Sequence, residues 1–255
     1  MRVSRLYVPL ALVPDSLVEL DTESGHYART VLRLKKGDHI VLFNGKGGEF
    51  LCDFVEVSRN SVRLRINAWS DRSVESPLRI NLGLGISRGD RMDLSVQKAV
   101  ELGVNSIAPL TTERCVVHIK GEKEKQRLSH WQKIVQHAAE QSGRTVVPEL
   151  AQIMPIQHWV VKQQGLKVFL DPYAEQTLTQ LQPDMMKVTL LIGPEGGFTD
   201  QERGIAKAAG FIPVRLGSRI LRTETASIAA LAAVQMLWGD FSIAEFENAN
   251  REAKK

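Results

Sequence analysis

The chain has 255 residues, a net charge of +4 and 43% hydrophobic residues, which are ordinary values for a folded globular protein. No apolar run reaches the roughly 18–20 residues that a membrane-spanning helix needs, and the first residues lack the apolar core of a signal peptide. Two cysteines, Cys52 and Cys115, are too few for a disulfide framework and have no metal-ligand spacing. We therefore expect a cytoplasmic protein without a metal, and its weakly basic charge alone does not predict a nucleic-acid partner.

The first part of the chain, residues 1–72, is predicted to form a small β-barrel or sandwich. Glycine-rich turns at residues 37–38 and 44–48 separate short apolar segments. The predicted strands are Leu6 to Val8, His39 to Phe43, Glu49 to Val57 and Val62 to Ile66. A polar stretch without periodicity, Asn67 to Pro77, follows and is predicted to be the linker.

From residue 76 to residue 240 the pattern alternates between strands and helices. The predicted strands are Leu78 to Ile86, Ser106 to Leu110, Lys167 to Leu170, Val188 to Ile192 and Phe211 to Leu216. The predicted helices are Arg91 to Leu102, Lys125 to Ser142, Asp200 to Ala209 and Thr223 to Trp238. This alternation predicts an α/β domain with a parallel sheet and helices on both faces. Residues 241–255 are expected to be a C-terminal tail.

The last predicted helix is apolar on all sides. Eleven of the thirteen residues from Ala226 to Trp238 are apolar, whereas a surface helix has one apolar stripe. The helix is therefore either central to the core or packed against a second subunit.

A glycine-rich loop follows the predicted strand Val188 to Ile192. It contains Gly193, Gly196 and Gly197, which allow backbone groups to approach a ligand closely. Thr199 and Glu202 have the spacing of a capping box that opens the next helix. The loop lacks the lysine of a nucleotide-binding P-loop and the G-x-G-x-x-G pattern of a dinucleotide fold. It therefore indicates a small-molecule site at a strand end that is not a standard phosphate site.

A second loop, Leu216 to Ala226, follows the last predicted strand. Glu195 of the first loop either points to water or holds a cation, and Arg222 of the second loop is the expected partner for a charge-assisted pair.

Several segments together resemble the RsmE family. They are Gly193 to Phe198, Leu216 to Ala226, Gln97 to Val104, Thr112 to Arg114 and Ala139 to Arg144 with Pro148, and more weakly Val31 to Arg33 with Gly37 and Asp38. The resemblance extends to about Gly239. One small departure from the family pattern is Ser218, at a position where proline is equally expected.

The resemblance implies methylation of N3 of a uridine in small-subunit ribosomal RNA, with S-adenosylmethionine as the methyl donor. It also implies a PUA-like N-terminal β-barrel, a SPOUT-type C-terminal domain with a trefoil knot, and a homodimer with the active site at its interface. The cofactor slot is expected to be lined by Leu170, Ile192, Gly193, Gly196, Gly197, Leu216, Gly217, Ile220, Leu221 and Thr225.

Three catalytic residues are expected from the chemistry of this reaction. Arg222 is placed to stabilise negative charge on the uracil oxygens, and Glu195 or Glu140 is the candidate to accept the N3 proton, for which burial must raise its pKa. RNA contacts are expected from Arg5, His26, Tyr27, Arg29, Arg33, Arg88, Arg114 and Arg144. Tyr27 or His26 is the candidate for base stacking, although His26 is equally consistent with a plain surface histidine.

The RNA partner is expected to be the free small-subunit RNA or the assembled subunit. Two alternatives stay open at this point. One is a related SPOUT enzyme that acts on another RNA, and the other is a ribosome-assembly factor that binds RNA without catalysis.

Overall fold

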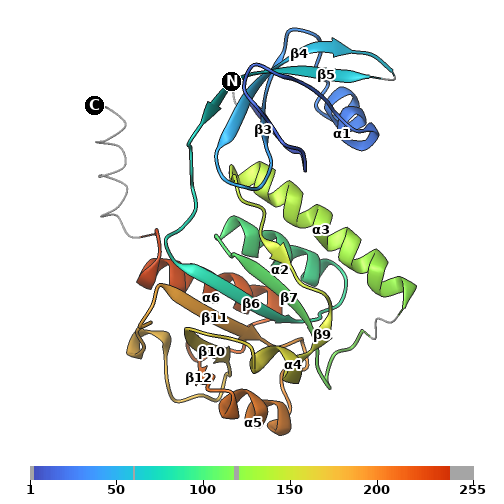
Figure 1. Ribbon diagram of the computed structural model, residues 1–255. Helices are drawn as coiled ribbons and strands as arrows, with labels where there is room; N and C mark the ends of the chain where they lie inside the picture. Colours follow the sequence, from blue (N-terminus) through green and yellow to red (C-terminus); the bar gives the residue numbers. More distant parts are fainter. Residues whose placement is uncertain (1–2, 60, 118–120, 242–255) are drawn as a thin grey trace. The chain divides into compact units, whose positions relative to one another are not determined.

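The computed structural model describes residues 3–59, 61–117 and 121–241, and the chain divides into two compact units (Figure 1). The first unit runs to Glu75 and also contains Ala139–Val147, and the second contains Ser76–Ala138 and the residues from Pro148 onward. The inclusion of residues 139–147 in the first unit differs from the expected division, because no local sequence pattern marks it. Apart from Phe241, the expected C-terminal tail, residues 241–255, lies outside the described residues.

The first unit is built on a five-stranded sheet in the order β1-β3-β4-β5-β2. β1 and β3 run parallel, and the other neighbours are antiparallel. The elements are β1 (Ser4–Tyr7), β2 (Leu17–Glu19), α1 (Thr22–His26), the π-helix η1 (Tyr27–Val31), β3 (His39–Phe43), β4 (Glu49–Val57) and β5 (Val62–Ser70). Alternate residues of the strands, such as Ile40, Leu42, Cys52, Phe54 and Leu64, form its core.

Two strands of this unit differ from the prediction. β5 continues to Ser70, into the segment expected to be linker, because Trp69 and Ala68 pair with Phe50 and Leu51 of β4. β2 was not predicted, since it has only three residues and lacks an apolar alternation.

The second unit contains an all-parallel sheet of seven strands in the order β12-β10-β11-β6-β7-β8, with β9 also paired to β7. The strands are β6 (Arg79–Gly85), β7 (Ser106–Thr111), β8 (Glu149–Leu150), β9 (Met154–Pro155), β10 (Leu166–Leu170), β11 (Lys187–Ile192) and β12 (Ile212–Val214). The predicted parallel α/β architecture is confirmed.

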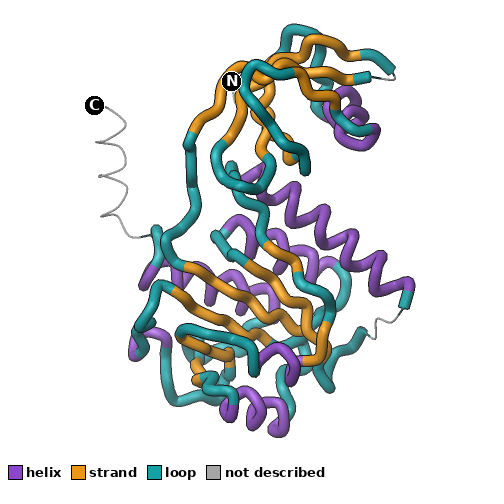
Figure 2. The backbone as a smooth tube through the Cα atoms, viewed as in Figure 1, coloured by secondary structure: helices purple, strands orange, loops and turns teal. Residues whose placement is uncertain are grey.

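Helices cover both faces of this sheet. The helices of this unit are α2 (Asp90–Glu101), α3 (Glu122–Ser142, whose residues from Ala139 on belong to the first unit), α4 (Ile156–Val160), the 3-10 helix η2 (Leu178–Gln180), α5 (Asp200–Ala208) and α6 (Thr223–Trp238). α2 packs against α6 behind the sheet in Figures 1 and 2, whereas α4 and α5 pack together on the nearer side. Trp159 of α4, Phe169 and Leu191 of the sheet, and Phe198 and Ala206 form one core cluster on that nearer side.

Local sequence signals set the ends of two helices. α2 stops before Gly103, whose φ of 82° is the left-handed conformation that ends helices. α5 begins at the expected capping box, in which Thr199 accepts a hydrogen bond from the Glu202 amide and Glu202 accepts one from the Thr199 amide.

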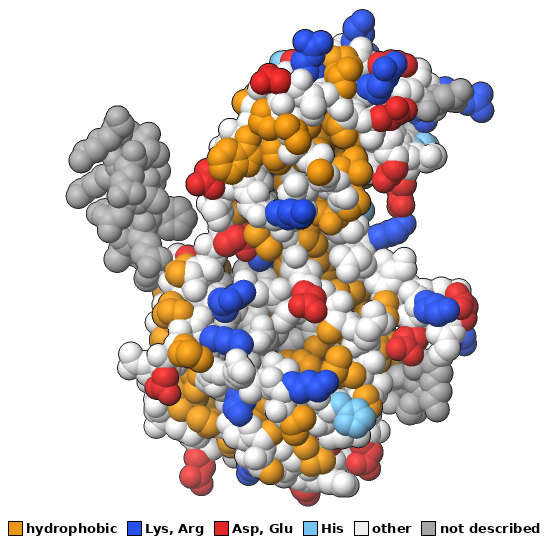
Figure 3. Space-filling view, viewed as in Figure 1, with side chains coloured by type: hydrophobic (Ala, Val, Ile, Leu, Met, Phe, Trp, Pro, Cys, Tyr) orange, Lys and Arg blue, Asp and Glu red, His pale blue; other side chains and the backbone are white. Residues whose placement is uncertain are grey.

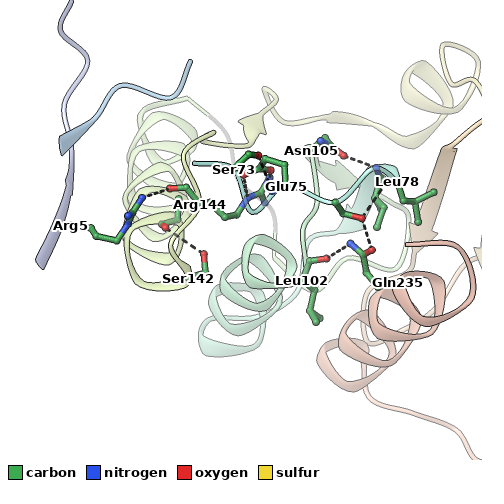
Figure 4. A network of polar contacts seen from close by, with 12 residues as sticks. Arg5, Ser73, Glu75, Leu78, Leu102, Asn105, Ser142, Arg144 and Gln235 are labelled. Carbon is green, nitrogen blue, oxygen red and sulfur yellow. Dashed lines mark hydrogen bonds and ion pairs between the residues drawn. The ribbon is translucent and has the colours of Figure 1, made fainter. Parts of the chain in front are cut away.

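α6 is buried on one side and partly exposed on the other. Ala230, Leu231 and Val234 lie in the core, while Met236 and Leu237 are exposed. Gln235 is also buried, and its side-chain amide accepts a hydrogen bond from Ser76 Oγ at 2.9 Å and donates one to the Leu102 carbonyl at 2.9 Å (Figure 4). This network joins the start of the second unit to the ends of α2 and α6.

On the face shown in Figure 3, lysine and arginine side chains are spread among acidic and apolar ones in each unit. Within the described residues, no helix is long and apolar enough to cross a bilayer.

Candidate active site

A cavity of about 520 Å³ opens where β10, β11 and β12 end. These three strands are neighbours in the parallel sheet, so the loops that follow them meet at one edge. The loops supply Leu170–Tyr173, Gly193–Phe198 and, except for Ser218, Leu216–Thr223 to the lining, and Arg91 of α2 and Arg114 after β7 also contribute. The size is typical of a small-molecule site.

The glycine loop after β11 is tightly packed on its outer side. A Cβ on Gly196 would lie 2.8 Å from Arg114 Cβ, and one on Gly85 of β6 would lie 2.5 Å from Pro194. Gly197 has a φ of 68° and no heavy atom within 4 Å of a built Cβ, so the space beside it is open. The loop therefore needs glycine for packing at residue 196 and for backbone conformation at residue 197.

Nine of the ten expected cofactor residues line this cavity. They are Leu170, Ile192, Gly193, Gly196, Gly197, Leu216, Gly217, Ile220 and Leu221. Thr225 is the exception, because it lies in the first turn of α6 with an exposed side chain outside the lining. The apolar residues form walls that exclude water from the slot. The backbone of the glycines supplies groups that can hydrogen-bond a ligand.

Glu195 lies at the cavity but does not pair with Arg222 as expected. Its carboxylate accepts a hydrogen bond from the Arg88 backbone amide at 3.0 Å and pairs with the Arg91 guanidinium at 3.3 Å. Burial raises the pKa of Glu195, but hydrogen bonds from the Arg88 and Glu195 amides and the charge of Arg91 outweigh it and hold that pKa below its usual value. A general base for a uridine needs the opposite shift, so the geometry makes Glu195 an ionised anchor of the loop.

The cavity lining is rich in arginine. Five arginines, Arg91, Arg114, Arg203, Arg219 and Arg222, face two acids, Asp171 and Glu195. Arg114 donates a hydrogen bond to the Gly196 carbonyl at 3.2 Å, and Arg203 lies beside Asp171 with a nitrogen–oxygen distance of 3.6 Å.

Arg222 and Arg219 differ from the other three, because neither has a side-chain hydrogen bond or ion pair within the described part of the chain. The excess positive charge at the cavity suits an anionic ligand or polymer.

Glu140 and Arg144 lie in the segment that belongs to the first unit, and both carry structural contacts. Glu140 Oε1 accepts a hydrogen bond from the Tyr7 amide at 2.9 Å and does not line the cavity. Arg144 is only 3% exposed and pairs with Glu75 through Nε at 3.1 Å, as Figure 4 shows. A guanidinium that is buried in this way presents no free surface to RNA, so the expected RNA contact by Arg144 is not accessible in this structure.

The other expected RNA-contact residues have mixed environments. Arg5 is mostly buried beside Glu49, and Arg29 donates hydrogen bonds to the Ser58 and Arg59 carbonyls at 2.6 and 2.9 Å. His26 and Arg33 are exposed in the first unit, and Arg88 and Arg114 are exposed in the second.

Tyr27 of the first unit is half-buried, and burial, aided by the charge of Glu140, raises the pKa of its phenol. It therefore presents only part of its ring.

Several residues of the cavity were not predicted from the sequence. Among them, Arg91, Asp171, Tyr173 and Arg203 carry charged or aromatic side chains. Asp171 and Tyr173 directly follow β10, a position at which side chains of a parallel sheet gather, so strand-end position was a usable signal for them. Arg91 and Arg203 lie on helices, where a charged residue usually only belongs to the solvent-exposed face, so their position gave no signal of a site.

Within the described residues, no group of three or more histidine, cysteine, aspartate or glutamate side chains is placed to hold a metal ion.

Comparison with known families assigns residues 74–235 to an RNA methyltransferase domain and residues 20–67 to an RNA methyltransferase PUA domain.

Known proteins resemble the chain over nearly all of its length. Ribosomal RNA small subunit methyltransferase E of Buchnera aphidicola is 37% identical over 94% of this chain and 99% of its own. A putative methyltransferase from Legionella pneumophila, solved with bound SAM, is 41% identical with a TM-score of 0.91, over 94% of this chain and 100% of that one.

A ribosomal RNA small subunit methyltransferase E from Neisseria gonorrhoeae, solved with S-adenosyl methionine, is 38% identical with a TM-score of 0.89, again over 94% of this chain and 100% of that one. A domain match to more than half of the chain and these full-length similarities agree with each other. The chain belongs to the ribosomal RNA small subunit methyltransferase E family.

Proposed function

We propose that this protein transfers a methyl group from S-adenosylmethionine to N3 of a uridine in small-subunit ribosomal RNA. The cavity between the loops after β10, β11 and β12, with Arg222 unpartnered at its wall, is the observation that carries the proposal. The names of its relatives support the substrate class, and the SAM-bound structures of two of them support the cofactor. The substrate would place the protein in the cytoplasm.

The cavity fits such a cofactor in size and chemistry. Leu170, Ile192 and Leu216 provide apolar walls, and the open space beside Gly197 leaves room for a ligand against the backbone of the glycine loop. When bound, S-adenosylmethionine supplies an electrophilic methyl group on a positively charged sulfur. The carboxylates of Glu195 and Asp171 offset part of the arginine charge that would otherwise repel this cation.

Arg222 is the proposed catalytic residue. Arg222 lines the cavity at the N-cap of α6, and its guanidinium pairs with no other described side chain. When the uracil N3 loses its proton, negative charge spreads to the neighbouring carbonyl oxygens, and a positioned guanidinium stabilises that charge. Glu195 and Glu140 are weaker candidates for the base: the Arg88 amide and Arg91 lower the pKa of Glu195, and Glu140 accepts a hydrogen bond from the Tyr7 amide and does not line the cavity.

RNA binding is proposed to involve both units. The PUA match of the first unit supports an RNA-binding role for its exposed His26 and Arg33, with Arg5, Arg29 and Tyr27. Arg88 and Arg114 extend the proposed contacts to the second unit. The free small-subunit RNA and the assembled subunit both contain the proposed substrate, a uridine of small-subunit ribosomal RNA.

Three architectural features of the family complete the proposal. They are a closed PUA-like barrel in the first unit, a trefoil knot in the second, and a homodimer that places the active site at its interface. The partly exposed apolar face of α6 supports the homodimer, because such a face gains stability when a second copy covers it.

The test is incubation of the full chain with methyl-labelled S-adenosylmethionine and small-subunit RNA, either free or in assembled subunits, followed by nucleoside analysis for 3-methyluridine. Formation of 3-methyluridine is expected. Methylation of another nucleoside or of another RNA would assign the chain to a related SPOUT activity. RNA binding without any methyl transfer would identify a non-catalytic assembly factor.

Arg222→Ala is expected to lower turnover by about a hundredfold or more, with the dissociation constant for S-adenosylmethionine nearly unchanged. Arg215→Ala is the matched control, because Arg215 is exposed just after β12 but does not line the cavity. Equal loss of cofactor affinity and turnover in Arg222→Ala would contradict the catalytic role.

A further inference from the structure

We propose that Tyr173 is a stacking surface for a base of the RNA substrate at the mouth of the cavity. This inference rests on the proposed function and extends it to how the substrate is recognised. Tyr173 follows β10, lines the cavity, and is 75% exposed. An aromatic ring that exposed leaves most of its apolar surface in water, which a ligand with a flat face would remove.

The loop holds Tyr173 through a buried carboxylate. Asp171 is 8% exposed, and its Oδ1 accepts a hydrogen bond from the Tyr173 amide at 3.0 Å. The Asp171 backbone is itself fixed, because its amide donates to the Val214 carbonyl of β12 at 2.9 Å and its carbonyl accepts from Ala174 at 3.1 Å. The backbone that carries the ring is thus anchored to the sheet.

Arg203 of α5 lies over the same ring. Its guanidinium carbon is 5.8 Å from the centroid of the Tyr173 ring, and its Nε lies 3.6 Å from the second carboxylate oxygen of Asp171. One carboxylate therefore orients both the tyrosine loop and the cation against it. This arrangement restrains the ring before any ligand binds and lowers the entropic cost of stacking.

The surroundings of the ring favour an RNA base over other flat groups. Arg203 and Arg219 also line the cavity and can attract the phosphates on either side of a stacked base. Unstacked bases held on aromatic rings are the common mode of single-stranded RNA recognition. The adenine of the cofactor is a poorer match for this position, because the apolar walls at Ile192 and Val214 are buried while the Tyr173 ring faces solvent.

The experiment compares Tyr173→Leu and Tyr173→Phe with the unchanged protein. Binding of fluorescent single-stranded oligouridine RNA is measured by anisotropy, and binding of S-adenosylmethionine by calorimetry. We expect Tyr173→Leu to weaken RNA binding by about tenfold, Tyr173→Phe to restore most of it, and cofactor affinity to stay within twofold. Val161→Ala is the control, because Val161 is exposed at the end of α4 and lies outside the cavity.

Two outcomes would overturn the proposal. One is a loss of cofactor affinity in Tyr173→Leu with RNA affinity unchanged, which would assign the ring to the cofactor. The other is unchanged RNA affinity in both variants. Because RNA binding is measured apart from methyl transfer, an inactive parent protein would count against the proposed function and leave the stacking comparison readable.

Discussion

Glu195 connects the glycine loop to the segment after β6 by two charge-assisted contacts. Its carboxylate accepts from the Arg88 amide and pairs with Arg91, and its pKa lies below the usual 4.5 because these contacts outweigh the effect of burial. A carboxyl group with a lowered folded-state pKa stabilises the protein above the unfolded-state pKa. That stabilisation is lost as the pH falls through the folded-state value.

We therefore predict that Glu195→Gln lowers the free energy of unfolding by about 1 kcal/mol at neutral pH. The difference from the unchanged protein should begin to shrink below pH 4.5, where the unfolded-state carboxyl takes up its proton, and should be gone once the pH has fallen through the lower folded-state pKa. Denaturant unfolding at a series of pH values measures it, with Glu175→Gln, at an exposed position after β10, as the control. A difference that does not change with pH would show that the charge of Glu195 has no part in it.

At the scale of elements, two glycines in and near α5 make opposite demands. A Cβ on Gly204 of α5 would meet no heavy atom within 4 Å, whereas one on Gly196 of the glycine loop would lie 3.0 Å from the Arg114 carbonyl oxygen as well as 2.8 Å from its Cβ. Gly204→Ala should raise the free energy of unfolding by about 0.5–1 kcal/mol, since alanine favours a helix interior, and leave cofactor affinity unchanged.

Gly196→Ala should instead weaken cofactor binding, because the loop or the segment after β7 has to move to admit the methyl group. Calorimetry with S-adenosylmethionine on both variants separates the two effects. Cofactor binding by Gly196→Ala that equals binding by Gly204→Ala would argue against a tightly fitted loop.

The sequence predicted the elements whose signals are local. The helix Thr223–Trp238 and the strands His39–Phe43 and Glu49–Val57 have the expected bounds, and the capping box of Thr199 forms as expected. The short β8, β9 and α4 were missed, because elements of two to five residues do not show a period. The partner of Glu195 was misjudged for another reason: Arg91 lies 104 positions away, and only the folded sheet brings it near.

At the scale of the whole molecule, one sheet edge collects residues from most of the second unit. The loops after β10, β11 and β12 lie at the carboxyl ends of neighbouring strands, and residues after β6 and β7 close the cavity from the other side. Arg222, the N-cap of α6, lies at this edge. The rest of α6 follows it and has a partly exposed apolar face. A second copy that covers α6 would therefore lie next to the loop that ends in Arg222.

This arrangement leads to a prediction about assembly. Met236 of α6 is 58% exposed on the apolar helix, and a charge at that position would have to be desolvated in the proposed dimer interface. Met236→Glu should shift the protein from dimer to monomer in sedimentation velocity and lower methyl transfer with it. Met185→Glu is the matched control, because Met185 is 57% exposed but precedes β11. A parent chain that sediments as a monomer, or a Met236→Glu variant that remains dimeric like Met185→Glu, would remove α6 from the interface.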